Sequence, residues 1–176
     1  NDGENPVVWM DGLDLPLVNH IGAMFMDQYP EEQFPEGQPH GDSYVRYGNN
    51  MRQVGVAPDR SDSPIFSYPY AKSCETLEKL SKTTDWDPYH GLKLEYIDPT
   101  SGGAAMSTIS TFLQLLPKDF KTEEYQTTEN TTYAVVEGSG QLTVKVKDEI
   151  EVINWKKNDV FVIPCKHKSS LTSYTA

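Results

Sequence analysis

The sequence predicts an all-β fold of the jelly-roll type, joined to a long irregular linker and short helices. From Leu92 onward, short apolar runs recur at roughly 8–12-residue spacing, and Gly, Pro or charged turns separate them. Residues 29–70 contain six prolines and no lasting period, which indicates an irregular connection rather than a sheet. Helical spacing of apolar residues is confined to two short stretches before residue 83. The regular part of the fold therefore lies in the second half of the chain.

The first half offers three short elements. Residues 7–10 are β-branched and aromatic and have strand character. Residues 15–28 carry apolar side chains at i, i+4, i+7 and i+8, and Pro16 suits a first helical turn, so we expect an amphipathic helix there. Ser73 is a suitable N-cap for a second helix that ends near Lys82. Seven aromatic residues between positions 29 and 70 indicate that the connection packs rather than being disordered.

The strands of the second half follow in order. Leu92, Leu94 and Tyr96 alternate with polar residues, as in a half-buried strand, and residues 99–103 form a turn. Further strands are expected at residues 109–116, 133–136, 142–146, 150–155, 159–163 and 171–174.

Composition excludes several classes of protein. Fifteen Lys and Arg residues against 26 Asp and Glu give a net charge of −11, which argues against binding to nucleic acid. No apolar run approaches the roughly 20 residues of a membrane span, and no signal-peptide pattern opens the chain, so we expect a soluble, cytoplasmic protein. Cys74 and Cys165 have no CxxC spacing, which indicates neither a disulfide framework nor a zinc site. The hydrophobic content of 37% is low, and we expect a partner or a further segment to complete the core.

Several phrases of the sequence point to a known family. Two of them, one ending a strand at a turn glycine and one ending a later strand at a proline, resemble the two motif strands of the cupin superfamily: Val135-Val-Glu-Gly-Ser-Gly140 and Asn158-Asp-Val-Phe-Val-Ile-Pro164. Longer phrases resemble gentisate 1,2-dioxygenases over essentially the whole chain: Trp9-Met-Asp-Gly-Leu-Asp-Leu-Pro16, Gly41-Asp-Ser-Tyr-Val-Arg-Tyr-Gly48, Ser63-Pro-Ile-Phe-Ser-Tyr-Pro-Tyr70, Gly91-Leu-Lys-Leu-Glu-Tyr96 and Thr111-Phe-Leu-Gln-Leu-Leu-Pro117.

The resemblance implies a cupin jelly roll (double-stranded β-helix) within a bicupin, an extradiol-type dioxygenase that uses ferrous iron and O₂ to open gentisate (2,5-dihydroxybenzoate) to maleylpyruvate. It places the last strand of a first cupin at residues 1–15, the linker between cupins at 16–90, and a second cupin, incomplete at its C-terminus, at 91–176. By the same resemblance the complete enzyme is a homo-oligomer, a tetramer, in the catabolism of aromatic compounds.

The family's iron site lies in the first cupin, where three histidines form a facial set with open positions. The resemblance puts those histidines upstream of Asn1. In the second cupin, the expected ligand positions fall on Tyr125, Thr127 and Thr131, and only His167 remains after the second motif, so we expect no metal ligands in this chain.

Trp9 and Asp11 are the candidate site residues. The resemblance implies that Trp9 belongs to the aromatic wall of the substrate pocket, and that Asp11 is a hydrogen-bond acceptor that orients a substrate-binding or ligand residue. Strand alternation sends both to one face. In the alternative interpretation, residues 11–14 are a strand-ending turn whose carboxylates cap the following helix, and this is the favoured role of Asp14.

The remaining histidines and arginines have weaker claims. No two of His20, His40 and His90 share a metal-ligand spacing, so structural or exposed roles are expected. Arg46, Arg52 and Arg60 are able to bind a substrate carboxylate, but in acidic surroundings the commoner role is pairing with a nearby Asp or Glu. A second hypothesis for the whole chain is a catalytically silent cupin that serves assembly or small-ligand binding. A carbohydrate isomerase on the same fold is a distant third.

Overall fold

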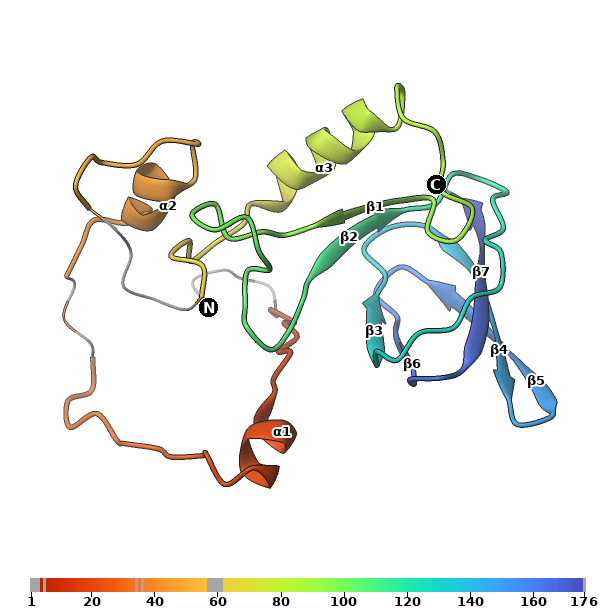
Figure 1. Cartoon of the computed structure of the whole chain (residues 1–176), viewed down its shortest axis with the longest axis horizontal. Helices are drawn as coiled ribbons and strands as arrows, with labels where there is room; N and C mark the ends of the chain where they lie inside the picture. The colour runs from red at the N-terminus through yellow and green to blue at the C-terminus, as the bar shows by residue number, and fades with distance from the viewer. Residues whose placement is uncertain (1–3, 5, 34, 36, 57–61, 176) are drawn as a thin grey trace. The chain divides into compact units, whose positions relative to one another are not determined.

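The computed structural model describes residues 4, 6–33, 35, 37–56 and 62–175, which form two compact units. Unit 1 comprises residues 1–66 and 97–110, and unit 2 comprises residues 67–96 and 111–176. Within the described residues, no helix is long and apolar enough to cross a membrane. Figure 1 shows the helices and strands in chain order.

Unit 1 contains two short helices, α1 (Leu15–His20) and α2 (Asp42–Tyr47). Pro16 lies in the first turn of α1, as predicted. The helix ends earlier than predicted because Gly22 adopts a φ of 70°, a left-handed conformation that stops the helical ladder. Helix α2 lies inside the segment expected to be irregular, and an ion pair between Asp42 and Arg46, one turn apart, supports it.

The strand predicted at residues 7–10 is not observed. Residues 7–14 form neither helix nor strand. A strand needs a hydrogen-bonded neighbour, and among the described residues none pairs with this segment. The residue types suit a strand, but the described part of the chain offers this segment no partner strand.

Hydrogen bonds join the distant pieces of unit 1. The N–H of Ser63 donates to the carbonyl of Ala105 (2.9 Å), and the N–H of Ser107 donates to the carboxylate of Asp62 (2.9 Å). The buried carboxylate of Asp98 accepts from the N–H and hydroxyl of Thr100 and from the hydroxyl of Ser101, which closes the turn predicted at residues 99–103.

Unit 2 begins with α3 (Tyr70–Leu80), which lies along the antiparallel pair β1 (Leu92–Glu95) and β2 (Phe112–Leu115) (Figure 1). Helix α3 starts three residues before the predicted N-cap, with Pro69 at the N-cap position. Ser73 lies inside the first turns, where its hydroxyl donates to the carbonyl of Pro69 (3.4 Å). Leu77 is the buried residue of α3, and the helix contacts β2.

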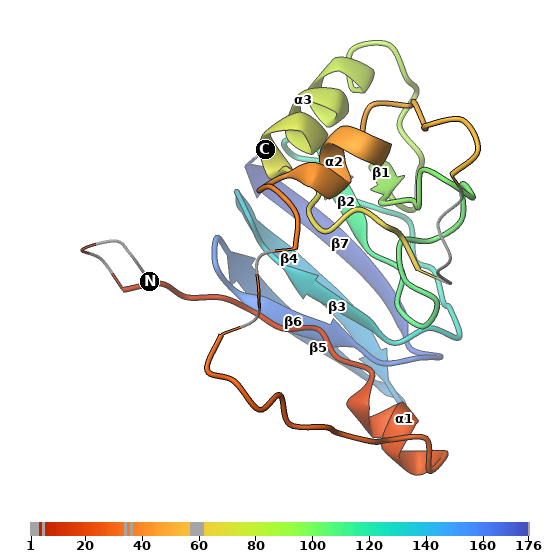
Figure 2. The same ribbon diagram turned by 90° about the vertical axis from the view of Figure 1, so that its left-hand side faces the viewer.

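The rest of unit 2 consists of two antiparallel sheets that face each other (Figure 2). One pairs β3 (Thr131–Ala134) with β6 (Val160–Ile163), and the other has the order β5-β4-β7, with β4 at Ser139–Val146, β5 at Glu149–Lys156 and β7 at Lys168–Thr175. Residues 120–125 line the far side of β7 through bridges at Lys121 and Tyr125. All seven strands overlap the predicted runs.

The core of unit 2 lies between these sheets. Leu142 is fully buried and packs with Val144 of the same strand, Ile163 of β6 and Leu171 of β7. Inward and outward residues alternate along β4, so the buried positions come from alternate residues of one strand. The all-β jelly-roll prediction is consistent with this arrangement.

Candidate functional site

The candidate residues Trp9 and Asp11 lie in the extended segment before α1. Trp9 is 80% exposed, and Asp11 is also exposed. Among the described residues no hydrogen bond or ring contact involves either side chain. The described part of the structure therefore gives neither side chain a polar or aromatic partner.

The same segment exposes an unusual amount of apolar surface. Eleven large apolar side chains between residues 7 and 26 are at least 48% exposed, with Val8 at 95% and Phe25 at 87%. Uncovered apolar surface of this extent marks a place where another surface normally packs. The exposed residues are Val7, Val8, Trp9, Met10, Leu13, Leu15, Leu17, Ile21, Met24, Phe25 and Met26.

Asp14 does not cap α1 through its side chain, which is the role that the sequence favours. It occupies the N-cap position of α1, but its side chain makes no capping hydrogen bond. Its carboxylate instead accepts from the hydroxyl of Thr108 (2.6 Å), and only its backbone carbonyl accepts from the N–H groups of Leu17 and Val18. Asp14 thus joins the two sequence pieces of unit 1, a contact across 94 residues that local capping rules do not reveal.

The second-cupin positions expected to match metal ligands are occupied by non-ligating residues in ordinary structural contacts. Tyr125 pairs through its backbone with Ser169, and the carbonyl of Thr127 accepts from the N–H of Lys166. Thr131 opens β3. The ring Nδ1 of half-buried His167 lies 3.0 Å from the carbonyl oxygen of Cys165 and so has a structural contact already.

An aromatic cluster with His90 occupies this part of unit 2. The rings of His90 and Tyr125 meet edge to face at 5.0 Å, and Tyr133 is a neighbour of Tyr125. Burial and the charge of Lys93 lower the pKa of His90. Burial, followed by the neighbouring Tyr125, raises the pKa of Tyr133, so this phenol keeps its proton.

The aromatic packing continues across the sheets. Tyr133 stacks on Phe161 with ring centroids 5.0 Å apart, and Trp155 lies beyond Phe161 at 6.5 Å. The indole N–H of Trp155 is buried with no hydrogen-bond partner among the described residues. Large rings, rather than imidazoles and carboxylates, therefore fill this interior. No spacing in the sequence indicates that His90 contacts Tyr125.

The donor set does not fit iron. Among the described residues, no three His, Cys, Asp or Glu side chains gather closely enough to hold a metal ion. His20 and His40 are exposed. Iron bound in the implied manner needs three imidazoles around open positions, and the described part of this chain does not provide them.

The structure describes two of the three candidate arginines, Arg46 and Arg52. The guanidinium of Arg46 donates to Asp42 (2.6 Å), which confirms the expected pairing with a nearby carboxylate and raises the pKa of Arg46. Arg52 is exposed. Arg60 lies outside the described residues.

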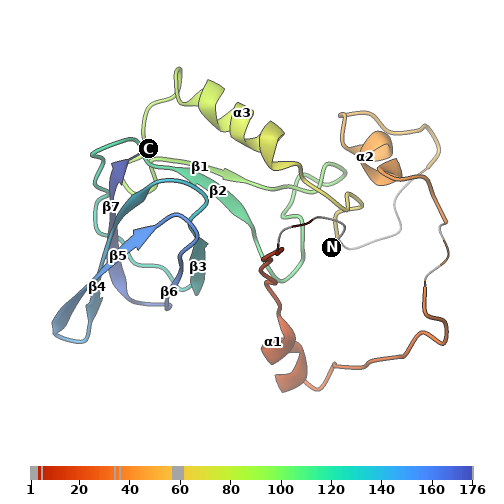
Figure 3. The same ribbon diagram turned by 180° about the vertical axis from the view of Figure 1, so that it is seen from behind.

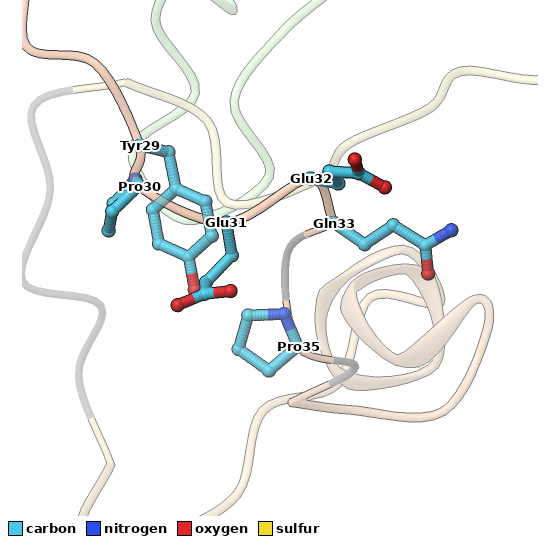
Figure 4. A pocket seen from close by; sticks show the side chains of 6 residues that line it. All are labelled: Tyr29, Pro30, Glu31, Glu32, Gln33 and Pro35. Atoms are coloured by element: carbon cyan, nitrogen blue, oxygen red, sulfur yellow. The ribbon is translucent and has the colours of Figure 1, made fainter.

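An open hollow of about 650 Å³ lies in unit 1 (Figure 4). A single stretch of chain lines it, with two carboxylates, Glu31 and Glu32, and no basic group among its lining residues. A hollow with this lining does not attract an aromatic acid, whose carboxylate would meet like charges. It is therefore not a candidate substrate site.

Solved structures show which fold this chain shares. The chain matches a variant of salicylate 1,2-dioxygenase from Pseudoaminobacter salicylatoxidans with a TM-score of 0.81 and 24% identity, over 99% of this chain and 50% of that one. It also matches a crystal structure of the same enzyme described as adducts with gentisate, with a TM-score of 0.71, 22% identity and 92% and 45% coverage. The fold is that of the cupin dioxygenases.

Curated sequences give the particular relatives. The chain is 47% identical over 164 residues to gentisate 1,2 dioxygenase 1 of Aquipseudomonas alcaligenes, which covers 93% of this chain and 46% of the relative. It is 28% identical to 5-aminosalicylate 1,2-dioxygenase of a Comamonas species, over 93% of this chain and 42% of the relative. No family model matches. The chain is a relative of the gentisate 1,2-dioxygenases, as its motifs predict, and it spans about half the length of the curated relatives it matches.

Proposed function

We propose that this chain is a portion of an Fe(II)-dependent, extradiol-type dioxygenase that opens gentisate with O₂ to maleylpyruvate. The observation that carries the proposal is the 47% identity to a gentisate 1,2-dioxygenase along 93% of the chain. The more distant relatives act, by their names, on 5-aminosalicylate and 1-hydroxy-2-naphthoate, so the substrate class common to all is an aromatic ring with a hydroxyl group.

Within that enzyme, residues 1–15 supply the last strand of a first cupin, residues 16–90 the linker, and residues 91–176 the second cupin. Trp9 contributes to the pocket wall, and Asp11 orients a neighbouring residue by accepting a hydrogen bond. The exposure of Trp9 and of the apolar side chains around it supports this assignment, because a strand inside a jelly roll has such side chains covered by the rest of its domain.

The iron ligands of the complete enzyme lie outside this chain. The described residues contain no ligand set, and Tyr125, Tyr133 and Phe161 occupy the interior of the second cupin. In this proposal the second cupin has a structural role, and Trp9 and Asp11 form part of the substrate pocket. Cytoplasmic location and a homotetramer complete the proposal.

The experiment that tests the proposal uses the full-length protein loaded with ferrous iron. With gentisate we expect O₂ consumption and growth of the absorbance band of the ring-opened product, and parallel reactions with salicylate, 5-aminosalicylate and 1-hydroxy-2-naphthoate rank the substrates. An iron-loaded, folded protein that consumes no O₂ with any of these compounds would refute the proposal.

A second candidate function is a catalytically silent cupin for assembly or small-ligand binding. The aromatic filling around Tyr133 and Phe161 favours it, because a cupin with no ligand set has no chemistry of its own. The coding frame upstream of Asn1 decides between the two. A cupin motif with HxH there supports the dioxygenase, and its absence supports the silent module.

A further inference from the structure

The connection between β1 and β2 is longer than an antiparallel pair needs. Strand β1 ends at Glu95 and β2 begins at Phe112, although the two strands pair directly and about two to five residues suffice for a hairpin loop. Figure 3 shows the chain leaving β1 and returning to β2 through this connection, drawn in green. Residues 97–110 of the connection belong to unit 1, whereas both strands belong to unit 2. Long connections of this kind usually have a function.

Hydrogen bonds within residues 97–110 give the connection a defined conformation. The N–H of buried Asp98 donates to the carbonyl of Gly103 (2.8 Å). The carboxylate of Asp98 accepts from the N–H of Thr100 (2.8 Å) and from the hydroxyl of Ser101 (2.9 Å). A turn closed in this way is a firm support for side chains further along the connection.

The end of the connection is bound to residues 62–63 at two points. The carbonyl of Ala105 and the N–H of Ser107 make these hydrogen bonds, each 2.9 Å long. Thr108 follows directly in the chain. Its backbone is therefore placed by the hydrogen bonds of its immediate neighbours.

Thr108 reaches the segment that carries the candidate pocket residues. Its hydroxyl donates to the carboxylate of Asp14 (2.6 Å), which lies three residues after Asp11 and five after Trp9. Among the described residues, no other hydrogen bond joins residues 7–22 to a distant part of the chain. Because the acceptor is a carboxylate, this hydrogen bond is stronger than one between neutral groups.

The geometry of Asp14 favours a role in holding this segment. An aspartate at an N-cap normally accepts a hydrogen bond from an N–H of its own helix, but the side chain of Asp14 makes no such bond. Its carboxylate bonds to Thr108 instead, while its backbone carbonyl accepts from the first N–H groups of α1. The contact with Thr108 therefore fixes the point where residues 7–13 end and α1 begins.

We propose that Thr108 is a positioning residue for the substrate pocket. By holding Asp14, it fixes the end of the segment that carries Trp9 and Asp11, and so the place of both side chains in the pocket wall. The inference rests on the proposed function. It gives the second cupin, to which Thr108 belongs in the proposed domain order, a role in a reaction for which it supplies no iron ligand.

The first test compares Thr108→Val with Thr108→Ser in the full-length, iron-loaded protein. Valine has the shape of threonine without the hydroxyl, whereas serine keeps the donor. We expect the KM for gentisate to rise roughly three- to tenfold in Thr108→Val, the size of one net hydrogen bond, at unchanged iron content and melting temperature. Thr108→Ser is expected to restore the KM of the wild type.

Ser107→Ala is the matched control for this comparison. It removes a hydroxyl from the neighbouring residue, which bonds to Asp62 through its backbone N–H, and it is expected to behave like the wild type. If Thr108→Val lowers only the amount of active enzyme and leaves the KM unchanged, Thr108 has a merely structural role and the proposal is overturned.

Hydrogen exchange measured by mass spectrometry tests the contact without the activity. Residues 7–22 are expected to exchange faster in Thr108→Val than in the wild type or Ser107→Ala. The double variant of Thr108→Val with Asp14→Ala is expected to exchange no faster than either single variant, because both remove the same hydrogen bond. Unchanged exchange in Thr108→Val overturns the proposal, whatever the KM. Faster exchange in a protein that opens no aromatic acid supports the contact and refutes the proposed function alone.

Discussion

Gly140 permits the closest approach between strands in unit 2, and adding one methyl group there tests the packing directly. A Cβ atom on Gly140 would overlap both the carbonyl oxygen of Thr172 on β7 and the ring of Trp155 on β5. The first obstacle is backbone, which has no rotamer to move away. Gly140 does not have a positive φ, so any destabilisation of Gly140→Ala comes from steric overlap of the added methyl group and not from backbone strain.

The expected cost follows from these contacts. Overpacking a filled site costs about 1–3 kcal/mol, and a backbone obstacle places Gly140→Ala at the upper end, about 3 kcal/mol. For a domain of 150–250 residues, each kcal/mol lowers the melting temperature by about 2–4 °C, so we expect a decrease of roughly 6–12 °C.

Thermal unfolding followed by circular dichroism measures the effect. Gly103→Ala is the matched control, since its Cβ would meet only the hydroxyl of Ser101 at 3.6 Å, an ordinary contact, and we expect a change within about 1 °C. If Gly140→Ala melts within the same range as this control, the close packing of Trp155 and β7 over Gly140 is refuted.

Three further predictions concern the site and the chemistry of the chain. Asp11→Asn in the full-length enzyme is expected to lower turnover at unchanged iron content, because it removes an acceptor that orients a neighbour; loss of the iron, measured by metal analysis, would make Asp11 a ligand or a folding residue instead. The 176-residue chain, dialysed after exposure to ferrous iron, is expected to retain no more iron than other acidic proteins, and about one iron per chain would contradict the missing ligand set. Burial lowers the pKa of His90 below that of the unfolded chain, so the unfolded state takes up a proton first as the pH falls through about 6.5, and stability decreases toward pH 5. His90→Gln is expected to make the decrease between pH 7.5 and pH 5.5 smaller, as measured by denaturant midpoints. An equal decrease in both proteins would argue against a lowered pKa of the partly buried His90.

Strand positions in unit 2 were predictable because their signal is local. Alternation from Leu92 and the turns at Gly138 and Asp148 mark where strands begin and end, and the structure keeps them within a few residues. Which strands pair is a different matter. The register of β4 with β7 joins residues about thirty positions apart, and no period in the sequence encodes it.

The errors have physical reasons as well. Helix α1 was predicted too long because its apolar spacing continues beyond Gly22, where the backbone turns left-handed. Residues 7–10 form no strand in the structure because no described strand lies beside them to pair with, and residue type alone does not supply a partner. The contact between Asp14 and Thr108 and the pair of His90 with Tyr125 were missed because each joins distant parts of the sequence.

The exposed apolar residues between positions 7 and 26 also decide how this chain behaves as a solute. Association through these side chains is opposed by the net charge of −11, because like-charged molecules repel one another over about 10 Å at 0.1 M salt and over a much shorter distance at 1 M. Sulfate and phosphate further strengthen contacts between apolar surfaces. Low ionic strength and a pH well above the pI of about 4.7 therefore keep the chain dispersed. Ammonium sulfate is expected to precipitate it, because sulfate strengthens contacts between the exposed apolar side chains.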